Sequence, residues 1–576
     1  MNLVWIACFV KLVVGEYDYI VVGGGTGGGT LATELAIKGF KTLLIEAGPD
    51  YYKANQSTPA FMGNSAEDEA ISFGFEVKHY DNGVNYFYPR AGVLGGCTTH
   101  NEMISIYPNT RDFELMQKLT GDGTWAEKNM RQYFRRLEKN QFRIRPKDQD
   151  HGFMGWMSNS YIDFLTQLKL DSNLVSFTLA MVGNPFYDVN GRDERGRLNS
   201  DREARVFVPQ AVDFVSKTRA NFPKYIKSIQ KKYPLDVWTD TFVTKLVFQG
   251  TTAVGVEYKK GRYLYRASPL SSDANRKNAS PGTIRAKKEI ILAGGTFNTP
   301  QILMLSGIGD KQHLSEFNIP VVADVPGVGR NMMDRYEIPI VNRYNSTFAL
   351  LKGCQFKSSS KDPCFREFLN HTGPYTSNGA ISGKLQKSNP SLREPDLFIL
   401  NTLSDFHGYY HGFAKNIQQR TDSSTHLILK ARTSNTNGQV KLLSSDPFDV
   451  PDINFRFFSD GESDLDILVQ ALKQERSFIK RNIFVPYEEV FPGNHIQTNK
   501  ELRKYIKDTS WGHHACCTAK MGTSDDPLAV VDAKFRVREV ENLRVVDMSI
   551  FPQIPAFFPA TYVHMMAMKA ADDITS

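Results

Sequence analysis

Three glycines and one glutamate near the start of the chain have the spacing of a dinucleotide-binding site. Gly23, Gly25 and Gly28 form a G-x-G-x-x-G turn directly after residues 18–22, a short run that is apolar after Asp18. Such glycines let the backbone approach a pyrophosphate, and the N-terminus of the next helix supplies free N–H groups. Glu46 follows a second apolar run, where its carboxylate can accept hydrogen bonds from ribose hydroxyls. We therefore predict a dinucleotide site, built from a strand at 18–22, a helix at 31–38 and a strand at 42–45; the alternative is an ordinary glycine-rich turn.

A chain of 576 residues is too long for one ordinary hydrophobic core, so we expect two or more domains. The composition, with 41% hydrophobic and 23% charged residues, excludes a disordered protein. The net charge of +7 is spread along the chain and forms no basic run, so we expect no nucleic-acid partner.

The N-terminus has the pattern of a secretory signal peptide. Residues 3–14 are mostly apolar, although Lys11 interrupts them, and an acceptable cleavage site ends at Gly15. The stretch is too short to span a membrane, so we expect a signal peptide at 1–15, a secreted, extracellular protein and no membrane partner. The alternative is a buried N-terminal strand. N-glycans are expected at some of the sequons Asn55, Asn278, Asn345 and Asn370.

The six cysteines predict a disulfide and no metal site. Cys354 and Cys364 are ten residues apart and could close a loop in an oxidising compartment. The adjacent Cys516 and Cys517 are not expected to pair with each other. The chain holds no C-x-x-C motif, so zinc binding has no support and no metal is expected.

Strand and helix patterns indicate a discontinuous nucleotide-binding domain. We predict an amphipathic helix at 126–139, strands at 235–238, 242–248, 253–258, 263–266 and 289–295, and a surface loop at 268–282. The nucleotide-binding domain is assigned to residues 16–155, 235–333 and 500–576. A substrate domain is assigned to residues 156–234 and 334–499.

Four motifs run along the chain in a fixed order: the glycine turn ending in 46–50, residues 90–101, residues 295–309 with 326–331, and residues 513–522 with 543–547. Together they resemble the glucose–methanol–choline (GMC) family of flavin oxidoreductases. The resemblance implies FAD as the cofactor. It also implies the α/β class, with a Rossmann-like FAD-binding domain and an inserted α+β substrate domain on a mainly antiparallel, six-stranded sheet.

The same resemblance implies the cofactor contacts. They are the pyrophosphate turn (Gly23, Gly25, Thr26, Gly27, Gly28), the adenosine ribose (Glu46, Ala47), the adenine (backbone of Val243), the isoalloxazine side (Val93, Cys97, Asn101, Glu102, Met103, Ile104) and the pyrophosphate or ribityl chain (Asp547). Asp547 could equally be a simple helix cap. His100 stands in the setting G-G-C-T-T-H-N. Family members with a histidine in a closely similar setting often bond it covalently to the flavin; the alternative is a histidine that packs beside the ring.

Alcohol oxidation needs a base near the flavin, and imidazole has a suitable pKa. The family's tail motif places that base at His514, with His513 beside it in flavin contact or core hydrogen bonding. The family's second polar residue falls on Phe558, which cannot hydrogen-bond an alkoxide. His564 or a residue of the substrate domain could replace it. Residues 405–411 form either a substrate loop or a solvated turn.

The implied enzyme is a secreted GMC-type FAD-dependent alcohol oxidase or dehydrogenase that transfers hydride from a CH–OH group to flavin N5. Phe557 and Phe558 favour a small aromatic or apolar alcohol, and a cyanohydrin such as mandelonitrile is compatible. The electron acceptor is oxygen or another compound. The alternatives are an FAD-containing hydroxynitrile lyase with no net redox chemistry and a non-catalytic flavoprotein.

Overall fold

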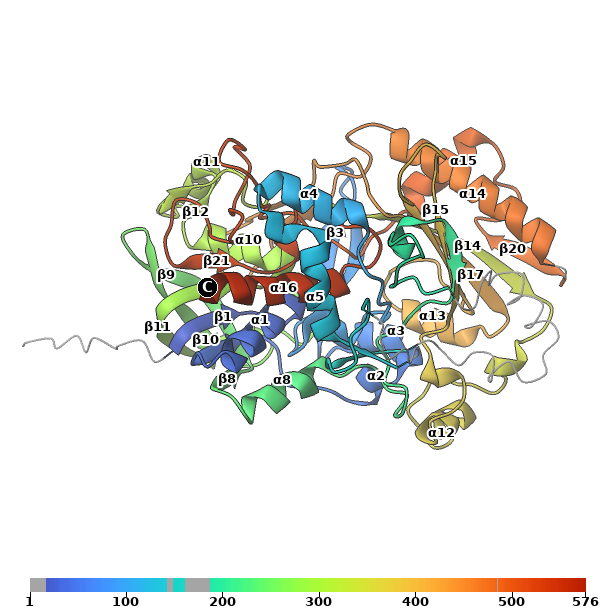
Figure 1. The fold of residues 1–576 in the computed structure, drawn as a ribbon, viewed down its shortest axis with the longest axis horizontal. Helices are drawn as coiled ribbons and strands as arrows, with labels where there is room; N and C mark the ends of the chain where they lie inside the picture. Colours follow the sequence, from blue (N-terminus) through green and yellow to red (C-terminus); the bar gives the residue numbers. More distant parts are fainter. Residues whose placement is uncertain (1–16, 142–148, 161–186, 484) are drawn as a thin grey trace, which may run out of the picture.

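The structure is a computed structural model that describes residues 17–141, 149–160, 187–483 and 485–576. The predicted signal peptide at 1–15 lies outside the described residues. Two lobes lie side by side in Figure 1, one around strands β1 and β11 and the other around strands β14 and β17. Among the described residues, no helix has the length and apolar character needed to cross a membrane.

The first lobe is built on a seven-stranded sheet of Rossmann type. Its parallel strands are β8 (Leu235–Trp238), β2 (Thr42–Ile45), β1 (Tyr17–Val22), β11 (Ser280–Leu292) and β21 (Leu543–Val545), and the antiparallel strands β10 (Thr252–Lys260) and β9 (Thr241–Gln249) extend from β11. The start, middle and end of the chain thus share one sheet, which confirms the predicted Rossmann-like fold class.

Helix α1 (Thr26–Ile37) begins inside the glycine turn, earlier than the predicted residue 31. Its first turn is mostly glycine, which carries no apolar pattern, so the sequence signal starts only at Leu31. Helix α1 packs against α16 (Ala560–Thr575), and α5 (Glu127–Leu137), close to the helix expected at 126–139, packs against α16 as well. The helix α1 therefore presents its N-terminus at the edge of the sheet where β1 ends.

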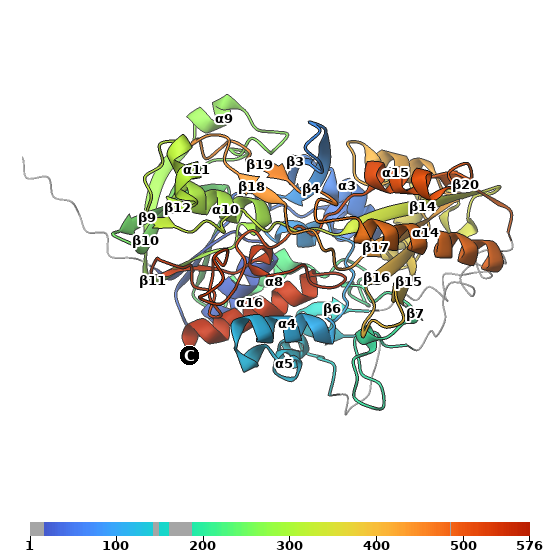
Figure 2. The ribbon, with the colours of Figure 1, turned by 90° about the horizontal axis from the view of Figure 1, so that it is seen from above.

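The second lobe is built on a six-stranded sheet in which every pairing is antiparallel, as predicted. The strand order is β20 (Tyr487–Phe491), β14 (Tyr336–Tyr344), β17 (Ser423–Lys430), β16 (Leu397–Thr402), β15 (Ala380–Gln386) and β7 (Ala204–Val206). The helices α14 (Ser463–Asn482) and α15 (Asn499–Thr509) lie together beside it in Figure 2.

The two lobes are joined by pairings between segments that the sequence assigned to different domains. Strands β3 (Ser72–Lys78) and β4 (Asn85–Ala91) share a four-stranded sheet with β18 (Gln439–Lys441) and β19 (Asp452–Asn454).

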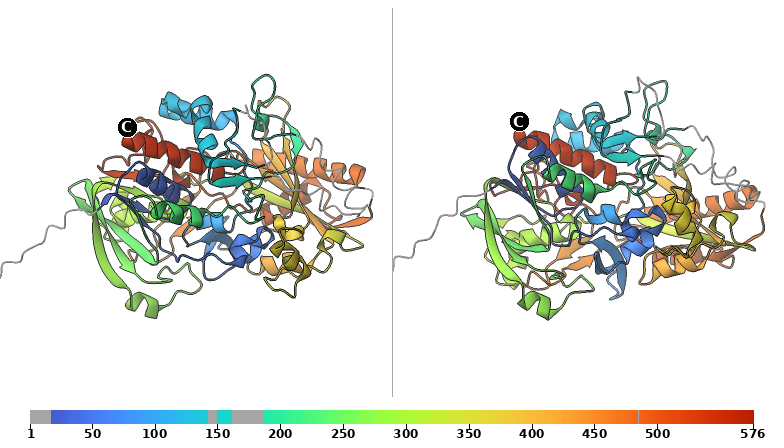
Figure 3. Two further views of the ribbon diagram at one scale, coloured as in Figure 1. Left: turned by 60° about the horizontal axis from the view of Figure 1, so that its bottom comes forward. Right: turned by 90° about the horizontal axis from the view of Figure 1, so that it is seen from below.

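Helix α8 (Phe222–Gln230) lies beside α1 in Figure 3. A Cβ at Gly29 would come within 2.9 Å of the ring of Phe222, so the glycine permits this close packing.

The remaining elements are mostly short. They are α2 (Ala54–Ser57), α3 (Met62–Ala66), α4 (Thr110–Thr120), α9 (Asp273–Lys277), α10 (Gly295–Leu305), α11 (Lys311–Glu316), α12 (Pro363–Leu369), α13 (Phe413–Gln419), β5 (Glu138–Asn140), β6 (Met157–Asn159), β12 (Ile308–Gly309) and β13 (Ala323–Asp324). The strand expected at 263–266 does not form. Tyr263 adopts a left-handed backbone conformation with a φ of 53°, and the buried Tyr265 instead donates a hydrogen bond to Gln301. The loop expected at 268–282 contains α9 and the start of β11.

The predicted disulfide between Cys354 and Cys364 is present. The expectation for the other pair was wrong, because Cys516 and Cys517 are bonded to each other. Cys517 has a left-handed backbone conformation, with a φ of 79°, and both side chains are fully buried. A pattern of residue types does not reveal this local backbone turn.

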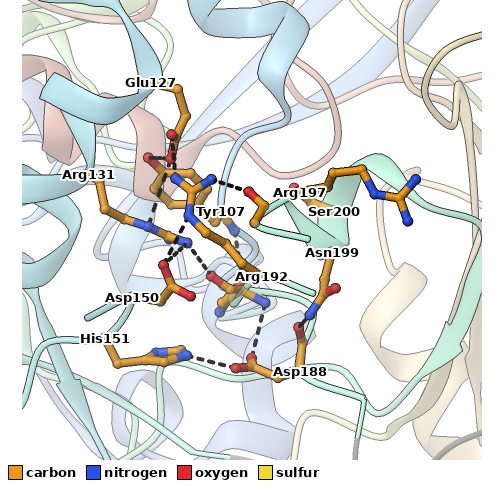
Figure 4. A network of polar contacts seen from close by, with 12 residues as sticks. Tyr107, Glu127, Arg131, Asp150, His151, Asp188, Arg192, Arg197, Asn199 and Ser200 are labelled. Carbon is orange, nitrogen blue, oxygen red and sulfur yellow. Dashed lines mark hydrogen bonds and ion pairs between the residues drawn. The ribbon is translucent and has the colours of Figure 1, made fainter. Parts of the chain in front are cut away.

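A buried polar network holds the excursion between β4 and β8 together (Figure 4). The imidazole of His151 lies between two carboxylates, 2.9 Å from Glu138 and 2.8 Å from Asp188. Arg192 bonds Asp150 and Glu127 in the same network. Burial alone would lower the pKa of His151, but the two carboxylates outweigh it and raise the pKa to about 10.

Candidate active site

One cavity between the two lobes brings together most of the predicted site residues, and its volume with the open mouth is about 2010 Å³. The predicted residues that line it are Gly23, Gly25, Thr26, Gly27, Glu46, Ala47, Cys97, His100, Asn101, Glu102, Met103, Ile104, Val243, His513, His514, Asp547 and Phe558. Val93 is buried outside this lining. Gly28 does not line the cavity, but the turn requires a glycine there, because a Cβ would lie 2.1 Å from the carbonyl oxygen of Gly23.

The end of the cavity at β1 and β2 has the geometry of a nucleotide site. The carboxylate of Glu46 accepts hydrogen bonds from the backbone N–H of Gly24 at 2.7 Å and of Gly48 at 2.8 Å. Burial raises the pKa of Glu46 to about 7, although these N–H groups lower it in part. A Cβ at Gly27 would lie 2.3 Å from the carbonyl oxygen of Val546, so only glycine lets α1 begin this close to the tail.

Asp547 combines the two roles that the sequence left open. Its Oδ1 accepts a hydrogen bond from the backbone N–H of Ser549 at 2.7 Å, which is a helix cap. Its Oδ2 accepts from the N–H of Gly295 at 2.9 Å and from the hydroxyl of Thr299 at 2.6 Å. These bonds hold the start of α10 in place. Asp547 also lines the cavity.

His100 lies in the cavity wall with an unpaired ring nitrogen. Its Nε2 is buried and has no hydrogen-bond partner among the described residues. Burial would raise the pKa of the neighbouring Cys97 thiol, but the positive charge of Arg90 and the contact with His100 lower it to about 6. An orphaned buried nitrogen at this position fits a group that fills the cavity.

His513 and His514 lie side by side in the wall of the cavity, with ring centroids 3.9 Å apart and ring planes tilted by 41°. Their Nδ1 atoms lie 3.4 Å and 3.6 Å from Oε1 of Glu337. Burial lowers the pKa of both imidazoles well below the usual value, and the charges of Arg90 and Arg335 lower it further. Both rings are therefore neutral, and each has one ring nitrogen with a free lone pair. The positive charges of Arg90 and Arg335 also disfavour the binding of a doubly charged metal ion between Glu337 and the two histidines.

Asp334 fixes the histidine pair, and the sequence prediction missed it. Its Oδ1 accepts a hydrogen bond from the backbone N–H of His514 at 3.0 Å. Tyr88 donates its hydroxyl hydrogen to Asp334 and accepts from the N–H of Ala515 at 2.9 Å. The only sequence signal for Asp334 is its position three residues after Asn331, the last residue of the third motif.

The wall around the histidines is aromatic. Phe558 lies edge-on to His514, with ring centroids 5.9 Å apart, and Tyr409 lies edge-on to His513 at 5.3 Å. Tyr409 is the residue of the tract 405–411 that lines this cavity. His407 and His411 of that tract bond Asp405 and Glu76 instead.

His564 does not replace the missing polar residue. Its Nδ1 lies 2.7 Å from the hydroxyl of Thr30, and its ring packs against Trp156 and Phe222. Burial lowers its pKa to about 3. His564 is thus a packed core histidine outside the cavity lining.

Comparison with known proteins identifies the family. The model of the family described as GMC oxidoreductase matches residues 223–337 with its N-terminal part and residues 434–567 with its C-terminal part. The oxygen-dependent choline dehydrogenase of Staphylococcus aureus is 31% identical over 577 residues, which cover 97% of this chain and 93% of that protein. This chain belongs to the GMC oxidoreductase family. It is an FAD-dependent oxidoreductase that acts on alcohols.

Solved structures share the fold of this GMC oxidoreductase. The pyridoxine 4-oxidase from Mesorbium loti has a TM-score of 0.77 and 19% identity, with 97% of this chain and 99% of that chain covered. A fungal aryl-alcohol oxidase has a TM-score of 0.75 and 20% identity, with 97% and 98% covered.

The residues of this GMC oxidoreductase fit FAD. Gly23, Gly25 and Gly27 line the cavity beside the start of α1, where the pyrophosphate would lie, and Glu46 offers a carboxylate for the ribose. Asp547 and His100 also line the cavity, and the buried Nε2 of His100 has no hydrogen-bond partner among the described residues. When bound, FAD supplies the acceptor for the hydride of the alcohol.

Proposed function

We propose that this enzyme oxidises the CH–OH group of a small aromatic or apolar alcohol, with His514 as the general base. The observation that carries the proposal is the neutral, buried imidazole of His514, whose Nδ1 faces Glu337 while its ring lines the cavity. A hydrogen on Nδ1, directed at Oε1 of Glu337, would leave the lone pair of Nε2 for the hydroxyl proton. The carbinol carbon then loses its hydride and becomes a carbonyl.

The aromatic wall supports the choice of an apolar substrate. Phe558 and Tyr409 contact the histidine pair, and Phe413 packs on Tyr409 in the same lining. Such rings favour apolar or aromatic groups over the hydroxyls of a sugar. Phe558 stands where a polar partner of the substrate oxygen was expected. The second imidazole, His513, is the nearest polar ring to His514 and takes over that contact in our proposal.

We propose in addition that the protein is secreted and N-glycosylated. Asn278, Asn345 and Asn370 are exposed, whereas Asn55 is half-buried and lies near Asp68. The disulfide between Cys354 and Cys364 also suits an oxidising compartment.

Anaerobic mixing of the purified holoenzyme with a panel of alcohols tests the proposed reaction. Bleaching of the flavin absorbance by an aromatic or apolar alcohol is the expected result, and reoxidation by air would identify oxygen as the acceptor. Mandelonitrile is included to test a cyanohydrin substrate. Release of cyanide from it without bleaching would overturn the proposal in favour of a hydroxynitrile lyase.

A further inference from the structure

Glu102 lies at the junction of two cavities. It lines the cavity that holds His514, and it also lines a second cavity at the six-stranded sheet. The two cavities share Met62, Gly63 and Glu102 in their walls. The second cavity is largely apolar, with Leu350, Leu351, Phe356, Leu403, Phe406 and Leu427 among its lining residues.

The backbone around Glu102 is held on both sides. The side-chain amide of Asn378 donates a hydrogen bond to the carbonyl oxygen of Glu102, and Arg219 donates to the carbonyl oxygen of Asn101 at 2.7 Å. Met103 follows with a left-handed backbone conformation and a φ of 59°, which is uncommon for a residue with a side chain. The backbone position of Glu102 is therefore set by the fold.

The carboxylate of Glu102 has neither a hydrogen bond nor an ion pair with another described residue. Burial raises its pKa to about 7. Burial of a charged carboxylate without a partner costs free energy. A ligand with a positively charged hydrogen-bond donor would reduce that cost.

The cationic side chains near the histidines are already engaged. Arg90 donates to the carbonyl oxygen of His513 at 2.9 Å, and Arg335 donates to that of Pro555 at 2.7 Å. Glu337 faces the histidine pair. Glu102 is thus the carboxylate that remains for a ligand, and the ring of Tyr409 in the same wall adds an aromatic group suited to a cation.

We propose that Glu102 determines specificity by binding the ammonium group of an amino alcohol whose apolar substituent occupies the second cavity. The inference rests on the proposed alcohol oxidation and narrows its substrate class. The carbinol lies at His514, the ammonium group at Glu102 and the apolar group beyond Met62 and Gly63.

The test compares N-benzylethanolamine with its neutral isostere phenylbutanol, in which a methylene replaces the NH. We expect kcat/KM for the amine to be higher by about tenfold or more, as is typical of a charge-assisted hydrogen bond. Glu102→Gln keeps the size of the side chain and should remove this preference. Glu69→Gln, which removes an exposed carboxylate that lines neither cavity, should keep it. N-methylethanolamine, which lacks the apolar group, should be a poorer substrate than N-benzylethanolamine.

Calorimetric binding of N-benzylpropylamine to the holoenzyme gives a second measurement, because this amine has no hydroxyl to oxidise. Glu102→Gln should weaken its binding by about tenfold or more, and Glu69→Gln should not. Equal kcat/KM for the amine and its isostere, with binding unaffected by Glu102→Gln, would overturn the inference while the alcohol oxidation stands. Failure of every alcohol to bleach the flavin would instead overturn the proposed function.

Discussion

The Nδ1 atom of His514 lies 3.6 Å from Oε1 of Glu337, and neither atom has a hydrogen-bond partner among the described residues. Both atoms are buried, although the ring of His514 lines the cavity. Burial and the nearby carboxylate of Glu102 raise the pKa of Glu337 well above its usual value. A carboxyl oxygen of Glu337 that accepts the Nδ1 hydrogen would fix the tautomer with a free Nε2, as a base requires.

Replacement of Glu337 by glutamine tests this positioning role. The amide keeps the shape but is a weaker acceptor, so we expect slower flavin reduction, by about tenfold or more, and a shifted pH profile of the rate. Stopped-flow reduction across pH measures both. Glu69→Gln serves as the control for loss of one carboxylate, and an unchanged rate and pH profile in Glu337→Gln would contradict the role.

The bond between His100 and the flavin is tested by denaturing the holoprotein. We predict a covalent link, because His100 occupies the family setting and its Nε2 is orphaned in the cavity wall. Acid-precipitated protein should remain yellow, and His100→Ala should release the colour to the supernatant. A yellow supernatant from the unchanged protein would show that the link is absent.

Stability should depend on pH through His151. Its pKa is raised to about 10 in the fold, against about 6.5 in the unfolded chain. A raised folded pKa contributes stability that is complete below the unfolded pKa and is lost as pH rises through the folded pKa. We therefore expect His151→Gln to lower the free energy of unfolding at about pH 6.5, with a difference that shrinks toward about pH 10. A difference that is constant with pH in denaturant titrations would refute this assignment.

Secretion can be checked on protein from the native source. The mature chain should begin near Glu16 and carry glycan mass at exposed sequons such as Asn345 and Asn370. N-terminal sequencing and mass spectrometry of glycopeptides measure the two features. An intact Met1 together with no glycan mass would exclude the proposal.

The sequence predicts those parts of the site whose residues lie close together in the chain. The glycine turn, Glu46 and His514 stand in short motifs whose chemistry depends on neighbours in the chain, so strand, turn and site could be placed together. Asp334 and Glu337 act on His514 from about 180 residues away, and only the pairing of β14 with the tail brings them there. The carboxylate of Glu102 likewise lacks a partner because Arg90 and Arg335 bond backbone carbonyl groups elsewhere. The spacing of residues along the chain does not reveal these contacts.

The most direct test of the central claim compares flavin reduction by one good alcohol substrate in His514→Ala and His513→Ala under anaerobic rapid mixing. Both variants should keep FAD, as their absorbance spectra will report. Loss of the general base should slow reduction in His514→Ala by about 10²–10⁴-fold, and His513→Ala should lose less. A nearly normal rate in His514→Ala with a much slower His513→Ala would contradict the account and move the base to His513.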